Sequence, residues 1–151
     1  MKNSFFVGLL SLTLMISCQP GKQQLTNYVN PFLGTATLWE TKDLGYERHL
    51  KTRTWGAEVF PGSSVPNAMV QLSPVTQFRS GAGYQYEDTV IYGFSHTNKG
   101  HWNLLHLPIL PVTGNVSSDD YASKYSHTNE SAHPGYYQVF LDRYGVDAQL
   151  S

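Results

Sequence analysis

Cysteine and charge are both scarce in this sequence of 151 residues. The single cysteine, Cys18, excludes a framework of disulfide bonds and a zinc site built from several cysteines. Charged residues make up 14% of the chain, against roughly 25% in an average domain. Acidic and basic side chains nearly cancel and leave a formal net charge of −1. The composition therefore excludes a basic nucleic-acid-binding protein and a charged disordered tail.

The apolar run near the N-terminus is too short for a membrane-spanning helix. It extends from Phe5 to Ile16 after the basic residue Lys2, whereas a span needs about 20 residues. This arrangement is typical of an export signal, so we expect residues 1–17 to be removed as a lipoprotein signal peptide. The run leads to Met15-Ile16-Ser17-Cys18, which resembles a bacterial lipobox with methionine where leucine is more usual.

Cys18 is the residue that such a signal leaves at the new N-terminus with a lipid attached. The polar residues after it are typical of a flexible tether, which we place over residues 18–26. We expect an exported protein that is anchored by lipid to the bacterial membrane, in the periplasm or on the outer-membrane surface. That anchor would be its only contact with the membrane. The alternative is an ordinary signal peptide with an incidental cysteine.

Apolar and aromatic residues, in contrast, are plentiful. Hydrophobic residues make up 40% of the chain and aromatic residues 13%, which is enough for one buried core in a domain of this length. Turn signals recur from Leu25 onward and leave no segment long enough for a core helix. The runs between them are rich in β-branched and aromatic residues and are predicted strands: 68–72, 83–86, 89–94, 104–112, 136–141 and 146–150.

The last two runs predict a β-hairpin. Tyr137, Val139 and Leu141 form one apolar face while Gln138 and Asp142 point the other way, and the same period continues in residues 146–150 after a turn at Tyr144-Gly145. The fold class that we expect is all-β, an antiparallel β-sandwich. Because the last strand-like run continues almost to the final residue, we also expect the domain to be incomplete at its C-terminus.

Histidine recurs at intervals of five, at His96, His101 and His106. Successive members would point to opposite faces of a strand and would not stack on a helix, which argues against a shared metal ion. A loop from Thr97 to Trp102 could instead present His96, His101 and Trp102 to a sugar. An aromatic face covers the apolar side of a pyranose, while polar groups bond to its hydroxyls. The alternative is a buried histidine satisfied by backbone beside a core tryptophan.

Six motifs then appear in order along the mature chain: 28–35, 60–74, 83–86, 91–97, 110–114 and 134–139. Together they resemble the N-terminal domain of glycoside hydrolase family 92. The resemblance covers nearly all of the mature chain, so residues 27–151 are identified as a partial N-terminal β-sandwich domain of that family.

The resemblance implies an activity that this chain does not complete alone. Members of the family are calcium-dependent, inverting exo-α-mannosidases that act on N-glycans and mannans, with the β-sandwich packed on a larger helical-barrel domain. The catalytic acid, the base and the calcium ligands lie chiefly in that barrel. We therefore expect no catalytic and no metal-binding residue here, calcium only in the complete enzyme, and as partners an α-mannoside oligosaccharide and the missing barrel. The alternative is a free-standing carbohydrate-binding lipoprotein without catalysis.

The resemblance also implies which residues contact substrate. They are Gly34 and Thr35 after the Asn-Pro-Phe motif, and Phe94, Ser95, His96 and Thr97 in the Gly-Phe-Ser-His-Thr motif, to which the loop adds His101 and Trp102. For His96 to face a cleft while Phe94 packs inward, the strand must end or bend at Ser95-His96. Many members continue with His-Leu-Ser-Gly, where this chain has Asn98-Lys99-Gly100-His101, so we expect an altered specificity for linkage or aglycone.

Overall fold

The computed structural model describes residues 24–37, 57, 59–64, 70–76, 81–99 and 102–151. Within these ranges the regular structure consists of short strands and the 3-10 helices η1 (Leu25–Tyr28) and η3 (His127–Asn129). No helix in the described ranges has the length and apolar character that crossing a bilayer requires.

The largest sheet is antiparallel and has the order β7-β8-β9, formed by β7 (Glu130–His133), β8 (Tyr136–Leu141) and β9 (Val146–Leu150). The predicted hairpin is confirmed, because Val139 pairs with Ala148 and Leu141 with Val146. Its turn closes through a 2.9 Å bond from the Gly145 N–H to the Leu141 carbonyl oxygen. Gly145 has a φ of +60°, a conformation that glycine adopts without the steric cost of a side chain.

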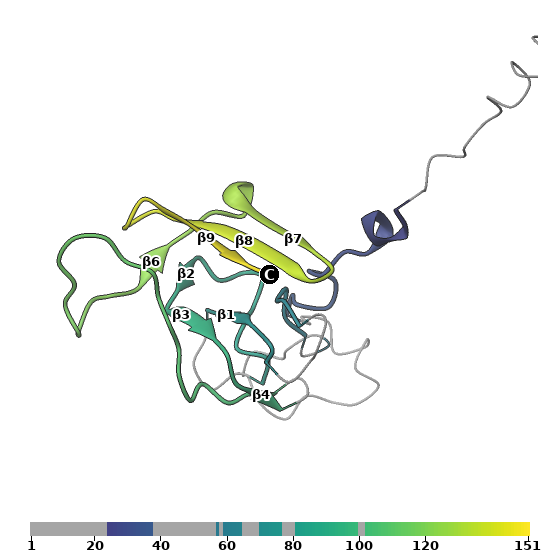
Figure 1. Ribbon diagram of the computed structural model, residues 1–151, viewed down its shortest axis with the longest axis horizontal. Coiled ribbons are helices and arrows are strands. Elements are labelled where there is room, and N and C mark those ends of the chain that lie inside the picture. The colour runs from purple at the N-terminus through teal and green to yellow at the C-terminus, as the bar shows by residue number, and fades with distance from the viewer. Residues whose placement is uncertain (1–23, 38–56, 58, 65–69, 77–80, 100–101) are drawn as a thin grey trace, which may run out of the picture.

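Two-stranded antiparallel sheets form the rest of the framework (Figure 1). They pair β1 (Ser73–Val75) with β3 (Gly93–Ser95), β2 (Val90–Ile91) with β6 (Ser123–Lys124), and β4 (Asn98–Lys99) with β5 (Trp102–Asn103). In Figure 1 the sheet of β7, β8 and β9 lies across one side of β1, β2 and β3. The antiparallel β-sandwich is thus confirmed.

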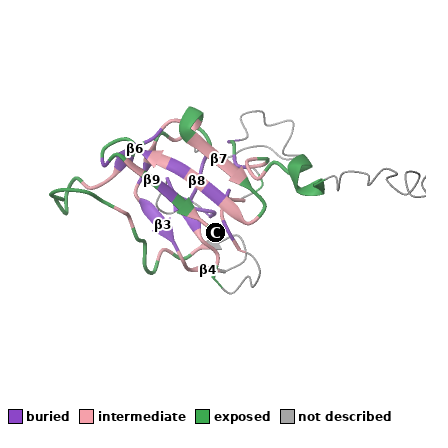
Figure 2. Ribbon diagram, turned by 45° about the horizontal axis from the view of Figure 1, so that its top comes forward, coloured by how far each residue is buried: buried purple, intermediate pink, exposed green. Residues whose placement is uncertain are grey.

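The core lies between these two layers. One layer contributes Tyr137, Val139, Leu141 and Ala148, and the other contributes Ile91, Phe94 and Tyr125. Figure 2 shows buried and less buried residues alternating along β8, as the period of two in the sequence predicts. The hairpin therefore presents one apolar face to the rest of the domain, and its other face points away from the core.

Several predicted strands differ in the structure. Residues 83–86 form no strand, because their backbone groups bond to separate segments: the Gly83 carbonyl oxygen accepts from the Thr76 N–H, and the Tyr86 N–H donates to the Thr35 carbonyl oxygen. The run 89–94 is divided into β2 and β3, which pair with different partners, and the run 104–112 contributes a single bridge between Ile109 and Phe94. The run 68–72 lies partly outside the described residues, and the strand there begins at Ser73. The sequence analysis missed β6 and β7, which are mostly polar, and it also missed β4 and β5, which form a short hairpin where a loop from Thr97 to Trp102 was predicted.

Candidate functional site

The Phe94–Thr97 motif begins inside the core and ends at its edge. Phe94 and Ser95 belong to β3 and are buried, and the Phe94 ring lies 6.4 Å from that of Tyr137. The Ser95 hydroxyl interacts with its own loop, since it lies 3.3 Å from the Thr97 N–H. These two side chains therefore point into the protein and position the residue that follows them.

His96 is the first residue after β3, so the strand ends at the position that the prediction for His96 requires. The imidazole is half-buried and lines a hollow of about 330 Å³, together with Phe94, Ile109, Pro111 and residues of β9. Its Nδ1 atom is buried and has no hydrogen-bond partner among the described residues. A buried polar atom of this kind is stabilised when a ligand or a further protein segment supplies a partner.

Two more unpartnered atoms lie in the hairpin that follows. The Asn98 side chain donates to the Gln71 carbonyl oxygen at 2.6 Å, but its own oxygen is buried without a partner among the described residues. The Asn103 side-chain nitrogen is also buried and has no hydrogen-bond partner among the described residues. Thr97 is used structurally, because its carbonyl oxygen accepts from the Leu104 N–H at 2.8 Å. The backbone of Trp102 pairs with that of Lys99, whereas His101 and Cys18 lie outside the described residues.

Gly34 and Thr35 form a tight turn after the Asn-Pro-Phe motif. Gly34 has a φ of +88°, and a Cβ atom there would lie 2.8 Å from that of Ala57. Thr35 is buried and its hydroxyl donates to the Phe32 carbonyl oxygen at 2.8 Å. Phe32 packs against the core cluster that contains Phe94. The two predicted substrate segments thus share a core, but no hydrogen bond or ring contact between described residues joins them directly.

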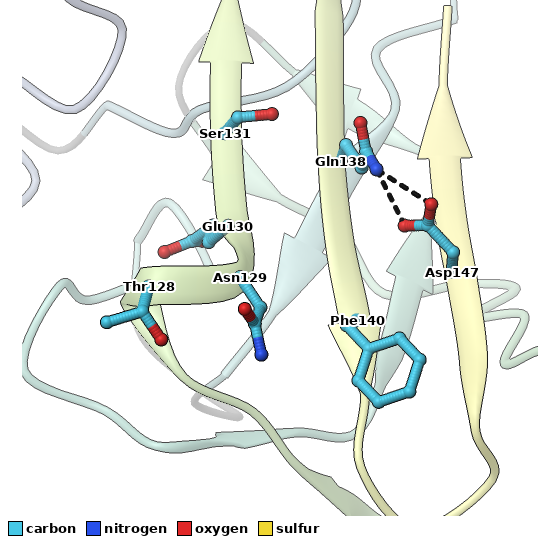
Figure 3. A pocket seen from close by; sticks show the side chains of 7 residues that line it. All are labelled: Thr128, Asn129, Glu130, Ser131, Gln138, Phe140 and Asp147. Atoms are coloured by element: carbon cyan, nitrogen blue, oxygen red, sulfur yellow. Dashed lines mark hydrogen bonds between the residues drawn. The ribbon is translucent and has the colours of Figure 1, made fainter.

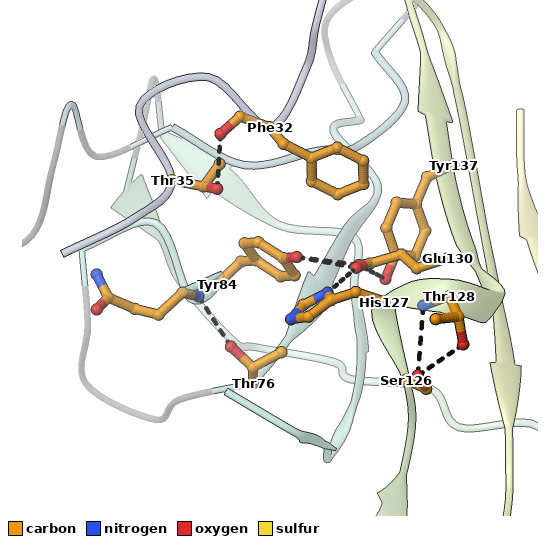
Figure 4. Close-up of polar contacts among 10 residues, drawn as sticks. Phe32, Thr35, Thr76, Tyr84, Ser126, His127, Thr128, Glu130 and Tyr137 are labelled. Atoms are coloured by element: carbon orange, nitrogen blue, oxygen red, sulfur yellow. Dashed lines mark hydrogen bonds and ion pairs between the residues drawn. The ribbon is translucent and has the colours of Figure 1, made fainter. Parts of the chain in front are cut away.

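The structure also contains a polar cluster that the sequence analysis missed (Figure 4). The Glu130 carboxylate is 1% exposed and accepts from the Tyr137 hydroxyl at 2.6 Å and from the Tyr84 hydroxyl at 3.0 Å. Its second oxygen lies 2.5 Å from Nδ1 of His127. Burial is the largest cause that raises the pKa of the Tyr84 and Tyr137 phenols well above their ordinary value, and the carboxylate adds to it.

His127 lies at the edge of this cluster, where its side chain is 30% exposed. The ring of Tyr86 stacks on the imidazole with the two centroids 4.1 Å apart. Phe32 meets Tyr86 edge to face at 5.8 Å. The cluster therefore connects the sheet of β7, β8 and β9 to the segment that carries Gly34 and Thr35.

Residues 28–151 match the glycosyl hydrolase family 92 N-terminal domain. The chain belongs to this family.

The family 92 domain is similar to solved mannosidases from Bacteroides thetaiotaomicron. It is 32% identical to the family GH92 α-mannosidase BT3965, with TM-scores of 0.62 for the structure in complex with mannoimidazole and 0.61 for a second structure. In both comparisons the match covers 85% of this chain and 17% of that chain. The family GH92 inverting mannosidase BT2199 is 22% identical, with a TM-score of 0.54 over 82% of this chain and 16% of its own, and shows the shared fold. No curated protein matches the chain.

The described part of this family 92 domain does not fit the calcium ion that the family implies. Calcium takes six to eight oxygen ligands, most often from several carboxylates. Among the described residues, no group of three or more His, Cys, Asp or Glu side chains could hold a metal ion. Glu130 and His127 form a pair, and the other partners of this carboxylate are phenols. We therefore derive no chemical step through a metal from these residues.

Proposed function

We propose that this chain is the N-terminal domain of an exported, lipid-anchored α-mannosidase that acts on α-mannosides of N-glycans or mannans. The observation that carries the proposal is the 32% identity, over 85% of the chain, to an α-mannosidase solved with mannoimidazole. Since the chain spans 17% of that relative, catalysis requires sequence outside these 151 residues. The proposed catalytic acid, base and calcium ion lie chiefly in a helical-barrel domain.

His96 is the residue that we propose to contact substrate from this domain. It stands at the end of β3 beside an open hollow, with a buried Nδ1 that lacks a partner among the described residues. Phe94 and Ser95 position it from within the core. The turn at Gly34 and Thr35 is proposed to border the substrate through its shape, since the Thr35 hydroxyl and backbone N–H both donate to the Phe32 carbonyl oxygen. Thr97, His101 and Trp102 complete the proposed contacts.

The experiment uses the longest gene product that contains this chain and measures mannose release from an α-mannoside, with and without a chelator. We expect release that is lost on chelation. Replacing His96 with Ala should lower kcat/KM by about tenfold to a few hundredfold, the loss of one hydrogen bond of roughly 1.5–3 kcal/mol, with little change in Tm. Absence of mannose release contradicts the proposed activity. A variant that loses stability but keeps its turnover contradicts the role of His96.

The lipid anchor has a separate test. We expect the expressed protein to fractionate with membranes and to incorporate a labelled fatty acid, and the Cys18→Ala variant to lose both properties. A Cys18→Ala protein that is processed and stays with the membrane contradicts the anchor. The mannosidase proposal does not depend on that outcome.

A further inference from the structure

The outward face of the β7-β8-β9 sheet carries an aromatic side chain in a polar surrounding (Figure 3). On β8 the inward residues Tyr137, Val139 and Leu141 are buried, and the outward residues Tyr136, Gln138 and Phe140 are half-buried. A hollow of about 590 Å³ lies over the outward side, where its lining includes Gln138, Phe140 and Asp147.

The register of the sheet places polar groups on both sides of the Phe140 ring. Phe140 pairs with Asp147 on β9, and Glu130 pairs with Val139, which puts Asn129 next to Phe140 on the other side. Neighbouring strands lie about 4.8 Å apart, so an amide and a carboxylate flank the ring at distances comparable with the width of a pyranose. Figure 3 shows that Phe140 is carried by the strand between the segments that carry Asn129 and Asp147.

The carboxylate of Asp147 is held in place from one side. The Gln138 side-chain nitrogen donates to its two oxygens at 2.9 and 2.7 Å. Gln138 is itself fixed, because its side-chain oxygen accepts from the Tyr136 hydroxyl at 2.8 Å. The side chains of Asn129 and Ser131 have no hydrogen-bond partner among the described residues. An oriented acceptor and free donors therefore surround one apolar ring.

These groups determine the chemical class of the ligand. No lysine, arginine or histidine lines the hollow, so a phosphate or another anion finds no positive partner there. The Glu130 carboxylate, although at the rim, is turned inward and satisfied by its phenol and imidazole partners. A purely apolar ligand would bury Asp147 without a new donor, which is unfavourable. A neutral sugar ring needs no positive partner and brings hydroxyl donors for the buried carboxylate. Its C–H face packs on Phe140, and its hydroxyls bond to Asp147 and Asn129.

We propose that the outward face of β7, β8 and β9 binds one sugar unit of an oligosaccharide on Phe140. That the sugar is an α-linked mannoside rests on the proposed function. Asp147 also borders the hollow beside His96, so the two hollows adjoin along β9. A chain of sugars held at Phe140 thus extends along the edge of the sheet toward His96.

Affinity electrophoresis of the full chain in gels containing soluble α-mannan tests the inference, and gels containing a β-glucan serve as the comparison. We expect α-mannan to retard the chain. Phe140→Ala and Asp147→Ala should each raise the Kd about tenfold, which corresponds to roughly 1.4 kcal/mol. Tyr28→Ala, which truncates an exposed aromatic residue in η1 outside this face, is the matched control and should keep the original Kd. Thermal melting of each variant shows whether it is folded.

Asp147→Ala keeps the test valid if Phe140→Ala does not fold, because the Asp147 side chain is exposed and its hydrogen bonds within the described part of the chain are to the side chains of Gln138 and Gln149. The inference is overturned if α-mannan does not retard the chain, if the β-glucan retards it equally, or if both variants keep the original Kd. Mannose release by the longest gene product is measured separately. If mannose is released but α-mannan does not retard the chain, only the Phe140 site is rejected. If α-mannan retards the chain but no mannose is released, only the proposed mannosidase function is rejected.

Discussion

The surroundings of Glu130 and of His96 differ in how their buried polar atoms are satisfied. Both oxygens of the Glu130 carboxylate accept hydrogen bonds from side chains, while the nearby Tyr125 hydroxyl is a buried atom with no partner in the part of the chain that the structure describes. Near His96, three buried atoms lack a partner among the described residues: Nδ1 of His96, the side-chain oxygen of Asn98 and the side-chain nitrogen of Asn103. A satisfied buried network stabilises a fold, whereas unpaired atoms cost stability until a partner supplies the missing bonds. The difference indicates a structural role for the Glu130 cluster and supports the substrate contact that we propose for His96.

The largest expected effect is the loss of the Glu130 carboxylate. Glu130→Ala leaves two buried phenols and an imidazole without their shared acceptor, so the free energy of unfolding should fall by about 3–5 kcal/mol. Urea denaturation measures this free energy of unfolding. Asp142→Ala removes an exposed carboxylate beyond β8 and should change the same quantity by less than about 0.5 kcal/mol. Equal losses in the two variants contradict the structural role of the cluster.

Alkaline pH should weaken the same cluster. The folded state raises the pKa of Tyr84 and Tyr137, so both phenols stay protonated in the folded chain while those of the unfolded chain ionise near pH 10. Stability is therefore complete below that pH and falls as the pH rises above it, by up to about 1.4 kcal/mol per pH unit for each tyrosine. Denaturation at a series of pH values gives the slope.

The Tyr84→Phe variant tests whether the loss of stability above pH 10 comes from the buried tyrosines or from a general effect of high pH. This variant removes one of three phenols whose pKa is raised by burial, those of Tyr84, Tyr125 and Tyr137, and keeps the ring. The slope above pH 10 should therefore fall by about a third. An unchanged slope means that other groups cause the alkaline loss.

A matched pair of histidine variants compares the two regions directly. His127→Phe removes a partner of the Glu130 carboxylate and should lower the free energy of unfolding by about 1–3 kcal/mol. His96→Phe removes an unpartnered Nδ1 and keeps a ring of similar shape, so stability should stay within about 1 kcal/mol or rise. Thermal and urea unfolding of both variants measure the contrast. A larger loss for His96→Phe than for His127→Phe would reverse the assignment of the two regions.

The sequence predicts what depends on neighbouring residues and misses what depends on distant ones. The hairpin over residues 136–150 could be predicted because its alternation and its Gly145 turn lie within one short segment. The Glu130 cluster could not, since Tyr84 lies 46 residues away and the segment around Glu130 is polar. The one signal of the cluster that the sequence contains is local: His127 and Glu130 lie three residues apart, a spacing at which their side chains can meet. Ile109 forms a bridge and no strand, because Pro108 and Pro111 lack the N–H that a ladder needs and Leu105, with a φ of +53°, turns the chain before them.

The smallest expected effect concerns a polar contact that water reaches, between Asp120 and Arg143. The two side chains are 78% and 36% exposed, and one guanidinium nitrogen donates to the carboxylate at 2.7 Å. The hydrogen bond to Arg143 lowers the pKa of Asp120, so the contribution of the pair is present above the ordinary pKa of an aspartate and is lost as the pH falls below it. Because salt screens exposed charges over about 10 Å at 0.1 M, Asp120→Asn should shift the urea midpoint slightly at low salt and not at high salt. A shift that persists at high salt would mean that this exposed contact behaves like the buried one at Glu130, and the distinction between satisfied buried networks and surface pairs would not hold for this domain.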